Sequence, residues 1–98
     1  MESDAFDLRT ETDALGGLVL AARGYLDAAG GAELSREASA ALASGHTRFR
    51  IDLGAVVLFN CAGARRLVEL LEELEKRESR VDLVGVHPPL QRALDFTA

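Results

Sequence analysis

The hydrophobic pattern of this 98-residue chain changes period several times, and this alternation constrains the fold more than any single motif. Segments whose apolar residues recur at every second position predict strands, whereas recurrence at i, i+3, i+4 and i+7 predicts helices. Strands that are separated by helices need crossover connections, which join parallel strands. The pattern therefore predicts an α/β fold, in which helices pack against a single mixed β-sheet in the order β-β-α-β-α-β-α.

The first half of the chain predicts a β-hairpin followed by a helix. The hairpin is expected from an edge strand, a glycine turn and a second strand, at Phe6–Glu11, Gly16-Gly17 and Leu18–Arg23. Asp27 is the expected N-cap of the helix, and Gly45 the residue that stops it. Glycine inside a helix costs ~1 kcal/mol relative to alanine. Gly30-Gly31 therefore predicts a loose first turn, with the regular helix beginning near Ala32.

The second half predicts strand, helix, strand and a short last helix. The alternating segment "RFRIDL" and the apolar run Ala55–Phe59 predict a buried strand. The next helix has one apolar face, made of Leu67, Leu70, Leu71 and Leu74. The stretch "RVDLVGV" predicts another buried strand, and "HPPLQRALDF" predicts the last helix. Pro88 and Pro89 suit its first turn, where a missing N–H has no intrahelical partner to lose.

Composition favours one domain, residues 1–98, that acts by binding proteins. Hydrophobic residues make up 48% and charged residues 28%, without low-complexity tracts, which is typical of a domain with one core. The net charge is −5 and the eleven Lys and Arg are scattered, which argues against nucleic-acid binding. The polar, acidic first residues resemble no targeting signal. The run Ala55–Phe59 is far shorter than the ~20 residues that span a membrane. We expect a cytoplasmic protein without a membrane partner.

The residue types that carry enzyme or metal chemistry are few and scattered. Cys61 is the only cysteine, so an intramolecular disulfide is impossible, which fits a reducing cytosol. His46 and His87 have no spacing with Cys61 that indicates a metal site or a nucleophile–base pair. No glycine-rich phosphate loop is present. We therefore expect no cofactor, no metal and no enzymatic activity.

Three stretches follow one another in the order and at the spacings of a known family. The first, "ARGYLDAAGGAEL", matches through Gly24, Leu26 and Asp27. The second, "IDLGAVVLFNCAG", matches through Asp52, Leu53, Val56, Phe59 and Gly63, and the third is "LVGVHPPLQRALDF". From about Leu18 to Phe96 the chain thereby resembles the STAS domain of bacterial anti-sigma-factor antagonists.

The resemblance implies a regulator of transcription whose partner is an anti-sigma factor, itself a serine kinase-like protein. In such antagonists the anti-sigma factor phosphorylates a serine in the central stretch, and the added charge of about −1.5 to −2 breaks the complex. In this chain Asn60 and Cys61 stand where the family has aspartate and serine. No Ser or Thr lies between residues 48 and 78. Because thiols are not substrates of ordinary Ser/Thr kinases, we expect this loop not to be phosphorylated.

The resemblance also places a partner-binding surface around this regulatory loop, Asn60 and Cys61. The residues expected in that surface are Asp27, Ala62, Gly63, Arg65 and Arg66. The two arginines replace small apolar residues of the family, and cations near a helix start oppose the helix macrodipole. They indicate either a solvated face or a docking contact for an acidic partner surface.

Other interpretations of the same loop stay open. Cys61 is a small residue in a disabled switch, a partner contact, or a reactive thiol, because helix N-termini and neighbouring cations favour the thiolate. In the last case oxidation could replace phosphorylation as the signal that ends binding. The domain could also serve as a scaffold STAS module in a signalling complex, with binding indifferent to kinase and ATP.

Overall fold

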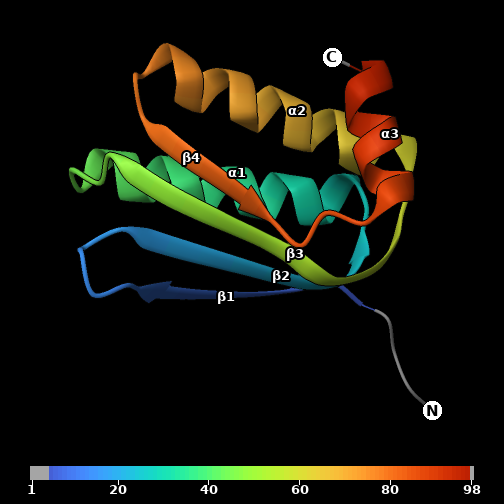
Figure 1. Ribbon diagram of the computed structural model, residues 1–98, viewed down its shortest axis with the longest axis horizontal. Coiled ribbons are helices and arrows are strands. Elements are labelled where there is room, and N and C mark those ends of the chain that lie inside the picture. The colour runs from blue at the N-terminus through green and yellow to red at the C-terminus, as the bar shows by residue number, and fades with distance from the viewer. Residues whose placement is uncertain (1–4, 98) are drawn as a thin grey trace.

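The computed structural model describes residues 5–97 as a four-stranded sheet with helices packed on one face (Figure 1). The elements are β1 (Asp7–Thr12), β2 (Leu18–Leu26), α1 (Ala28–Ala43), β3 (Arg48–Phe59), α2 (Cys61–Lys76), β4 (Arg80–Val84) and α3 (Pro88–Thr97). The strand order is β1-β2-β3-β4, with β1 antiparallel to β2 and the other pairs parallel. The predicted mixed sheet and element order are confirmed.

The β1–β2 hairpin is held by a carboxylate in its turn. Asp13 Oδ1 accepts hydrogen bonds from the backbone N–H of Gly17 at 2.8 Å and of Leu15 at 2.9 Å. These two bonds lower the pKa of Asp13, because they favour the charged carboxylate. Gly16 has a φ of +83°, a conformation that glycine adopts readily. The hairpin lies where the sequence predicts it, but β2 continues three residues beyond the expected Arg23.

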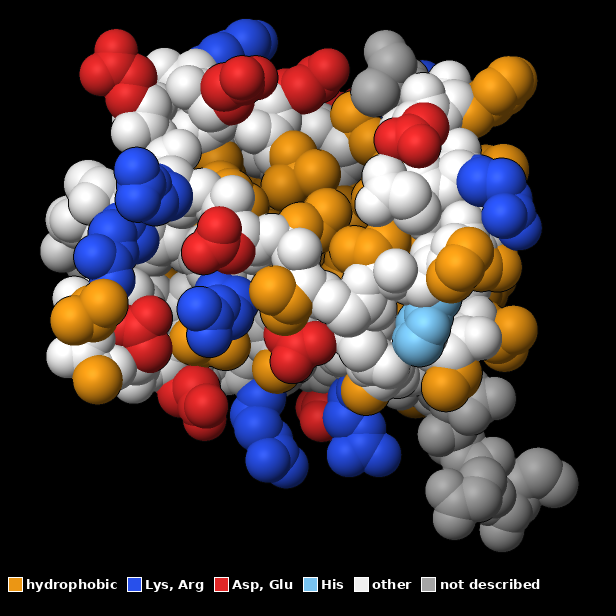
Figure 2. Space-filling model, in the orientation of Figure 1, with side chains coloured by type: hydrophobic (Ala, Val, Ile, Leu, Met, Phe, Trp, Pro, Cys, Tyr) orange, Lys and Arg blue, Asp and Glu red, His pale blue; other side chains and the backbone are white. Residues whose placement is uncertain are grey.

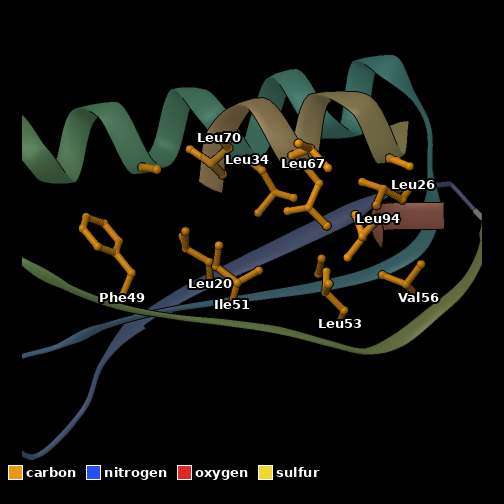
Figure 3. Close-up of a cluster of buried hydrophobic side chains, with 14 of the residues drawn as sticks. Leu20, Leu26, Leu34, Phe49, Ile51, Leu53, Val56, Leu67, Leu70 and Leu94 are labelled. Atoms are coloured by element: carbon orange, nitrogen blue, oxygen red, sulfur yellow. The ribbon is translucent and has the colours of Figure 1, made fainter. Parts of the chain in front are cut away.

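The core lies between the helices and one face of the sheet (Figure 3). In the first halves of β2 and β3 every second residue points toward the helices, and seven large side chains of the domain are fully buried: Leu20, Leu26, Leu34, Ile51, Leu53, Leu67 and Leu74. The opposite sheet face carries the alternate residues, including the exposed Arg50 and Asp82. This one-sided burial is typical of a two-layer α/β domain.

Helix α1 begins at Ala28, so the prediction of a regular helix only from about Ala32 is wrong. Gly30 and Gly31 lie within the helix and are buried. A Cβ on Gly30 would meet the Phe6 ring at 2.7 Å, and one on Gly31 would meet the Arg66 side chain. The two glycines therefore allow other elements to approach α1 closely, and this packing outweighs their low helix propensity.

The sequence predicted a buried strand here, but β4 is the last strand of the sheet and none of its residues is fully buried. Val81 and Leu83 point toward the helices and are half-buried, whereas Arg80, Asp82 and Val84 are exposed. The prediction rested on the many apolar residues of "RVDLVGV". Only one face is covered, and only in part, because a groove separates β4 from α2 and α3, which lie on that side of the sheet (Figure 1).

Candidate functional site

The starts of α1 and α2 lie side by side at one edge of the sheet. Strands β2 and β3 are parallel neighbours, so their C-terminal ends, and the helices that follow them, meet at the same edge. The backbone N–H of Asn60 donates a hydrogen bond to the carbonyl of Leu26 at 3.2 Å. The structure thus brings together Asp27 and the loop Asn60-Cys61, two parts of the expected site that are 33 residues apart in the sequence.

Both helix starts are capped by the same type of hydrogen bond. Asp27 Oδ1 accepts from the N–H of Gly30, and Asn60 Oδ1 accepts from the N–H of Gly63, each at 2.8 Å. These bonds satisfy backbone donors that have no partner inside the helix. The N-cap prediction for Asp27 is confirmed. Asn60, expected only as the replacement of an aspartate, is the N-cap of α2.

The side-chain amide of Asn60 also donates a hydrogen bond, which an aspartate at this position could not donate. Its side-chain nitrogen donates to the hydroxyl of Tyr25 at 3.1 Å, so the amide joins the end of β2 to the start of α2. Tyr25 is not among the site residues expected from the sequence. Its place just before Leu26-Asp27 is the only available signal, since nothing in the sequence relates it to a residue 35 positions away.

Gly63 fixes how closely α2 approaches the end of β2. The residue is buried, and a Cβ at this position would collide with the carbonyl of Leu26 and lie 3.1 Å from the Cα of Asp27. Because the obstacle is backbone, it cannot swing away as a side chain could. Gly63 offers little surface to a partner, and its predicted role in partner binding stays a prediction.

The outer side of the α2 start is exposed and positively charged. Cys61, the first residue of α2, is a free, exposed thiol, and Ala62, Arg65 and Arg66 are exposed as well. Among the described residues neither arginine forms a side-chain hydrogen bond or an ion pair. The stem of Arg66 packs over Gly31 of α1 while the residue remains exposed, as long cationic side chains commonly do. The first turn of α2 contains no acidic residue.

Two exposed apolar residues, which the sequence did not lead us to expect at the surface, precede this loop in β3. Val57 is 64% exposed and Leu58 is 52% exposed, so the prediction of a wholly buried strand over Ala55–Phe59 is wrong. The cause lies in the register of β3 against β2, which shifts twice and leaves one extra β3 residue each time. Such bulges interrupt the alternation of inward and outward side chains. Gly54, inside the strand, was the signal that could have predicted this irregularity.

Over residues 5–97 no three His, Cys, Asp or Glu side chains are grouped so that they could hold a metal ion. Within the same residues, no helix combines the length and apolar character that crossing a bilayer requires. At the capped α2 start and the strand before it, the structure exposes two arginines, a thiol and two apolar side chains.

Comparison with known proteins assigns the family. The model of the family described as "Mlab, STAS domain" matches residues 10–97, and the chain therefore belongs to the STAS domain family. A comparison with curated protein sequences gave no match.

Solved structures of antagonists share the fold. An anti-sigma factor antagonist from Mycobacterium paratuberculosis is 26% identical, with a TM-score of 0.77 over 96% of this chain and 79% of the other. The antagonist SpoIIAA in its unphosphorylated form is 19% identical, with a TM-score of 0.75 over 92% and 83%. The phosphorylated form of the Bacillus cell fate determinant SpoIIAA is 18% identical, with a TM-score of 0.76 over 94% and 84%. The chain has the fold of a regulatory STAS domain.

Proposed function

We propose that this STAS domain is a cytoplasmic regulator that binds a kinase-like anti-sigma factor, or a related signalling protein, at the start of α2. The observation that carries the proposal is the surface itself. Exposed Arg65 and Arg66 lie on the first turns of α2, and the exposed Val57 and Leu58 lie just before it. Family membership and the likeness to antagonists support the choice of partner.

The composition of this surface suits protein binding. Arginine is enriched in protein interfaces, and hot spots combine such residues with apolar groups that lose their water on binding. The caps at Asp27 and Asn60 and the tight approach at Gly63 hold the surface in one geometry, which reduces the ordering cost of association. Because Arg65 and Arg66 have no acidic partners within the described chain, an acidic surface on the partner would complement them.

We further propose that the loop is not switched by phosphorylation. Cys61 occupies the position of the family's serine, and the segment from 48 to 78 contains no hydroxyl that a Ser/Thr kinase could modify. A domain of this kind stays bound where a typical antagonist would be released. It would act as a constitutive binder of the anti-sigma factor.

The binding surface is tested by charge reversal with a matched control. Candidate partners are purified kinase-like proteins encoded beside this one, and affinity is measured by calorimetry. Arg65→Glu with Arg66→Glu should weaken binding at least tenfold, because attraction becomes repulsion. Arg36→Glu with Arg92→Glu changes the net charge equally at exposed positions of α1 and α3, and should change affinity less than twofold. Binding by none of the candidates, or equal losses in both variants, contradicts the proposed surface.

The absence of a phosphorylation switch is tested with the same partner. The domain is incubated with the kinase and ATP and then mapped by mass spectrometry. We expect no phosphate on residues 56–66, and binding that ATP leaves unchanged. Cys61→Ser restores a hydroxyl at the exposed first position of α2, and its phosphorylation would show that the kinase still docks. A phosphate on this loop of the unaltered chain is the result that rules the proposal out. A scaffold role would instead show binding to partners that are not kinases.

Regulation through the thiol is a second candidate, favoured by the exposure of Cys61. Hydrogen peroxide converts an accessible thiol into a sulfenic acid, with water as the second product. Oxidised and reduced domain are compared in the binding assay, with Cys61→Ala as the control that peroxide should not affect at this position. If oxidation leaves the affinity of the unaltered chain unchanged, or if the folded domain resists alkylation at Cys61, this candidate fails.

A further inference from the structure

A groove lies between α2, β4 and α3, on the side of the sheet that carries the helices. Its volume is about 600 Å³. The floor includes Leu71, Val81 and Leu83, which are half-buried, and the rim includes Glu72, Glu75 and Asp95, which are exposed. Figure 2 shows hydrophobic side chains open to solvent in a hollow below α2, with acidic side chains above it.

The shape of the groove suits a helix. On α2 its lining residues are Val68, Leu71, Glu72 and Glu75, at i, i+3, i+4 and i+7. This is the spacing of the ridges with which helices pack against one another. Strand β4 is the last strand of the sheet, and its inward residues are only half-covered. Helices α2 and α3 therefore leave part of β4 uncovered, and one more helix lying in the groove between them would cover it.

The charge of the groove defines the chemistry of that helix. None of the residues that line it is Lys or Arg, whereas three carboxylates stand on its rim. Ser79, which also lines the groove, is half-buried, and its Oγ is shielded from solvent without a hydrogen-bond partner among the described residues. An apolar ridge flanked by basic side chains complements both the floor and the rim.

We propose that this groove binds an amphipathic helix of a partner protein, with an apolar ridge flanked by Lys or Arg. The site differs from the α2 start, since Cys61 and Glu72 are eleven residues apart, or about 16 Å along a helix. Arg65 and Arg66 lie near the start of α2, whereas Glu72 and Glu75 line the groove along its second half, which ends at Lys76. The groove thus gives the domain a second partner surface, which does not depend on the proposed function of the loop.

A designed peptide tests the proposal directly. The probe is a 16-residue helical peptide with leucine on one face and lysine beside it, and the control peptide has glutamate in place of each lysine. Amide chemical shifts of the isotope-labelled 98-residue domain locate the binding site, and a titration gives the affinity. We expect shifts at residues 68–75, 79–83 and 91–95 with the basic peptide and none with the acidic one. Glu72→Lys with Glu75→Lys should weaken binding at least tenfold.

A charge-matched variant separates the groove from bulk attraction. Glu37→Lys with Glu69→Lys makes the same change in net charge at exposed positions outside the groove, and should alter the affinity less than twofold. Equal weakening by the two variants, shifts centred on the α2 start, or absence of binding by the basic peptide overturns the proposal. Concentration-dependent broadening of the groove amides in the free domain would identify a second copy of the chain as the occupant, which also overturns it.

Discussion

The starts of α1 and α2 have the same backbone design but different chemistry. Each begins with a capping residue, two small residues and a glycine: Asp27-Ala28-Ala29-Gly30 in one and Asn60-Cys61-Ala62-Gly63 in the other. In both, the cap oxygen accepts from the glycine N–H at the same distance. The cap is a carboxylate at α1 and a neutral amide at α2. Both helix starts therefore have a side-chain cap, whereas the charge of the capping residue differs between them.

The difference in charge extends beyond the caps. Helix N-termini carry a partial positive charge, which the Asp27 carboxylate offsets at α1. At α2 the neutral Asn60 leaves that charge in place, and Arg65 and Arg66 add to it. The family pattern, with aspartate at the cap position, would place a carboxylate there. The α2 start of this chain is therefore the more positive of the two, which supports an acidic partner for it.

The largest effect is expected from filling the closest approach. Gly63→Ala should destabilise the domain by about 1–3 kcal/mol, the usual cost of overpacking, because the new methyl meets the backbone of Leu26. The equivalent change in α1, Gly30→Ala, meets the half-buried Phe6 ring, a side chain that can shift, so its loss should be smaller, while the higher helix propensity of alanine, by ~1 kcal/mol, favours both variants alike. Urea unfolding of both variants measures the difference. Equal losses would mean that the two starts are equally constrained.

Removing the caps should have an intermediate effect at both starts. Asp27→Ala and Asn60→Ala each leave a glycine N–H without its acceptor, which costs about 0.5–2 kcal/mol. The Asn60 variant also loses the hydrogen bond to Tyr25. Tyr25→Phe removes that bond alone, and its loss should be smaller than that of Asn60→Ala. Thermal unfolding compares the three, and an effect of Tyr25→Phe as large as that of Asn60→Ala would show that the cap contributes little.

The order of elements and the position of the site were predictable from local patterns. The period of the apolar residues gave the seven elements, and the N-cap preference of aspartate placed the start near Asp27. The family resemblance placed Asn60 and Cys61 at the second helix start, where the structure has them. These features depend on residues close to one another in the sequence, and for that reason the pattern reveals them.

The remaining features depend on contacts between distant segments. Gly30 and Gly31 predicted a weak helix, since nothing local indicates that Phe6 and Arg66 pack on them. The exposure of Val57 and Leu58 follows from the register of β3 against β2, which an apolar run does not specify. Likewise, the half-covered β4 reflects where the helical layer ends. In each case tertiary packing overrides a local preference.

The smallest effect, and the one most specific to the comparison, comes from exchanging the two cap charges. Asn60→Asp keeps a capping oxygen and adds a negative charge at the α2 start, and the Tyr25 hydroxyl can turn to donate to the new carboxylate, so the domain should gain about 0.3–1 kcal/mol at low salt. Asp27→Asn keeps the cap at α1 and removes the charge, which should destabilise it by a similar amount. Both differences should shrink in 1 M NaCl, where charges are screened beyond ~3 Å. Unfolding curves at low and high salt measure them. Changes of the same sign, or differences that salt leaves intact, would mean that the contacts of each cap, and not its charge, distinguish the two helix starts.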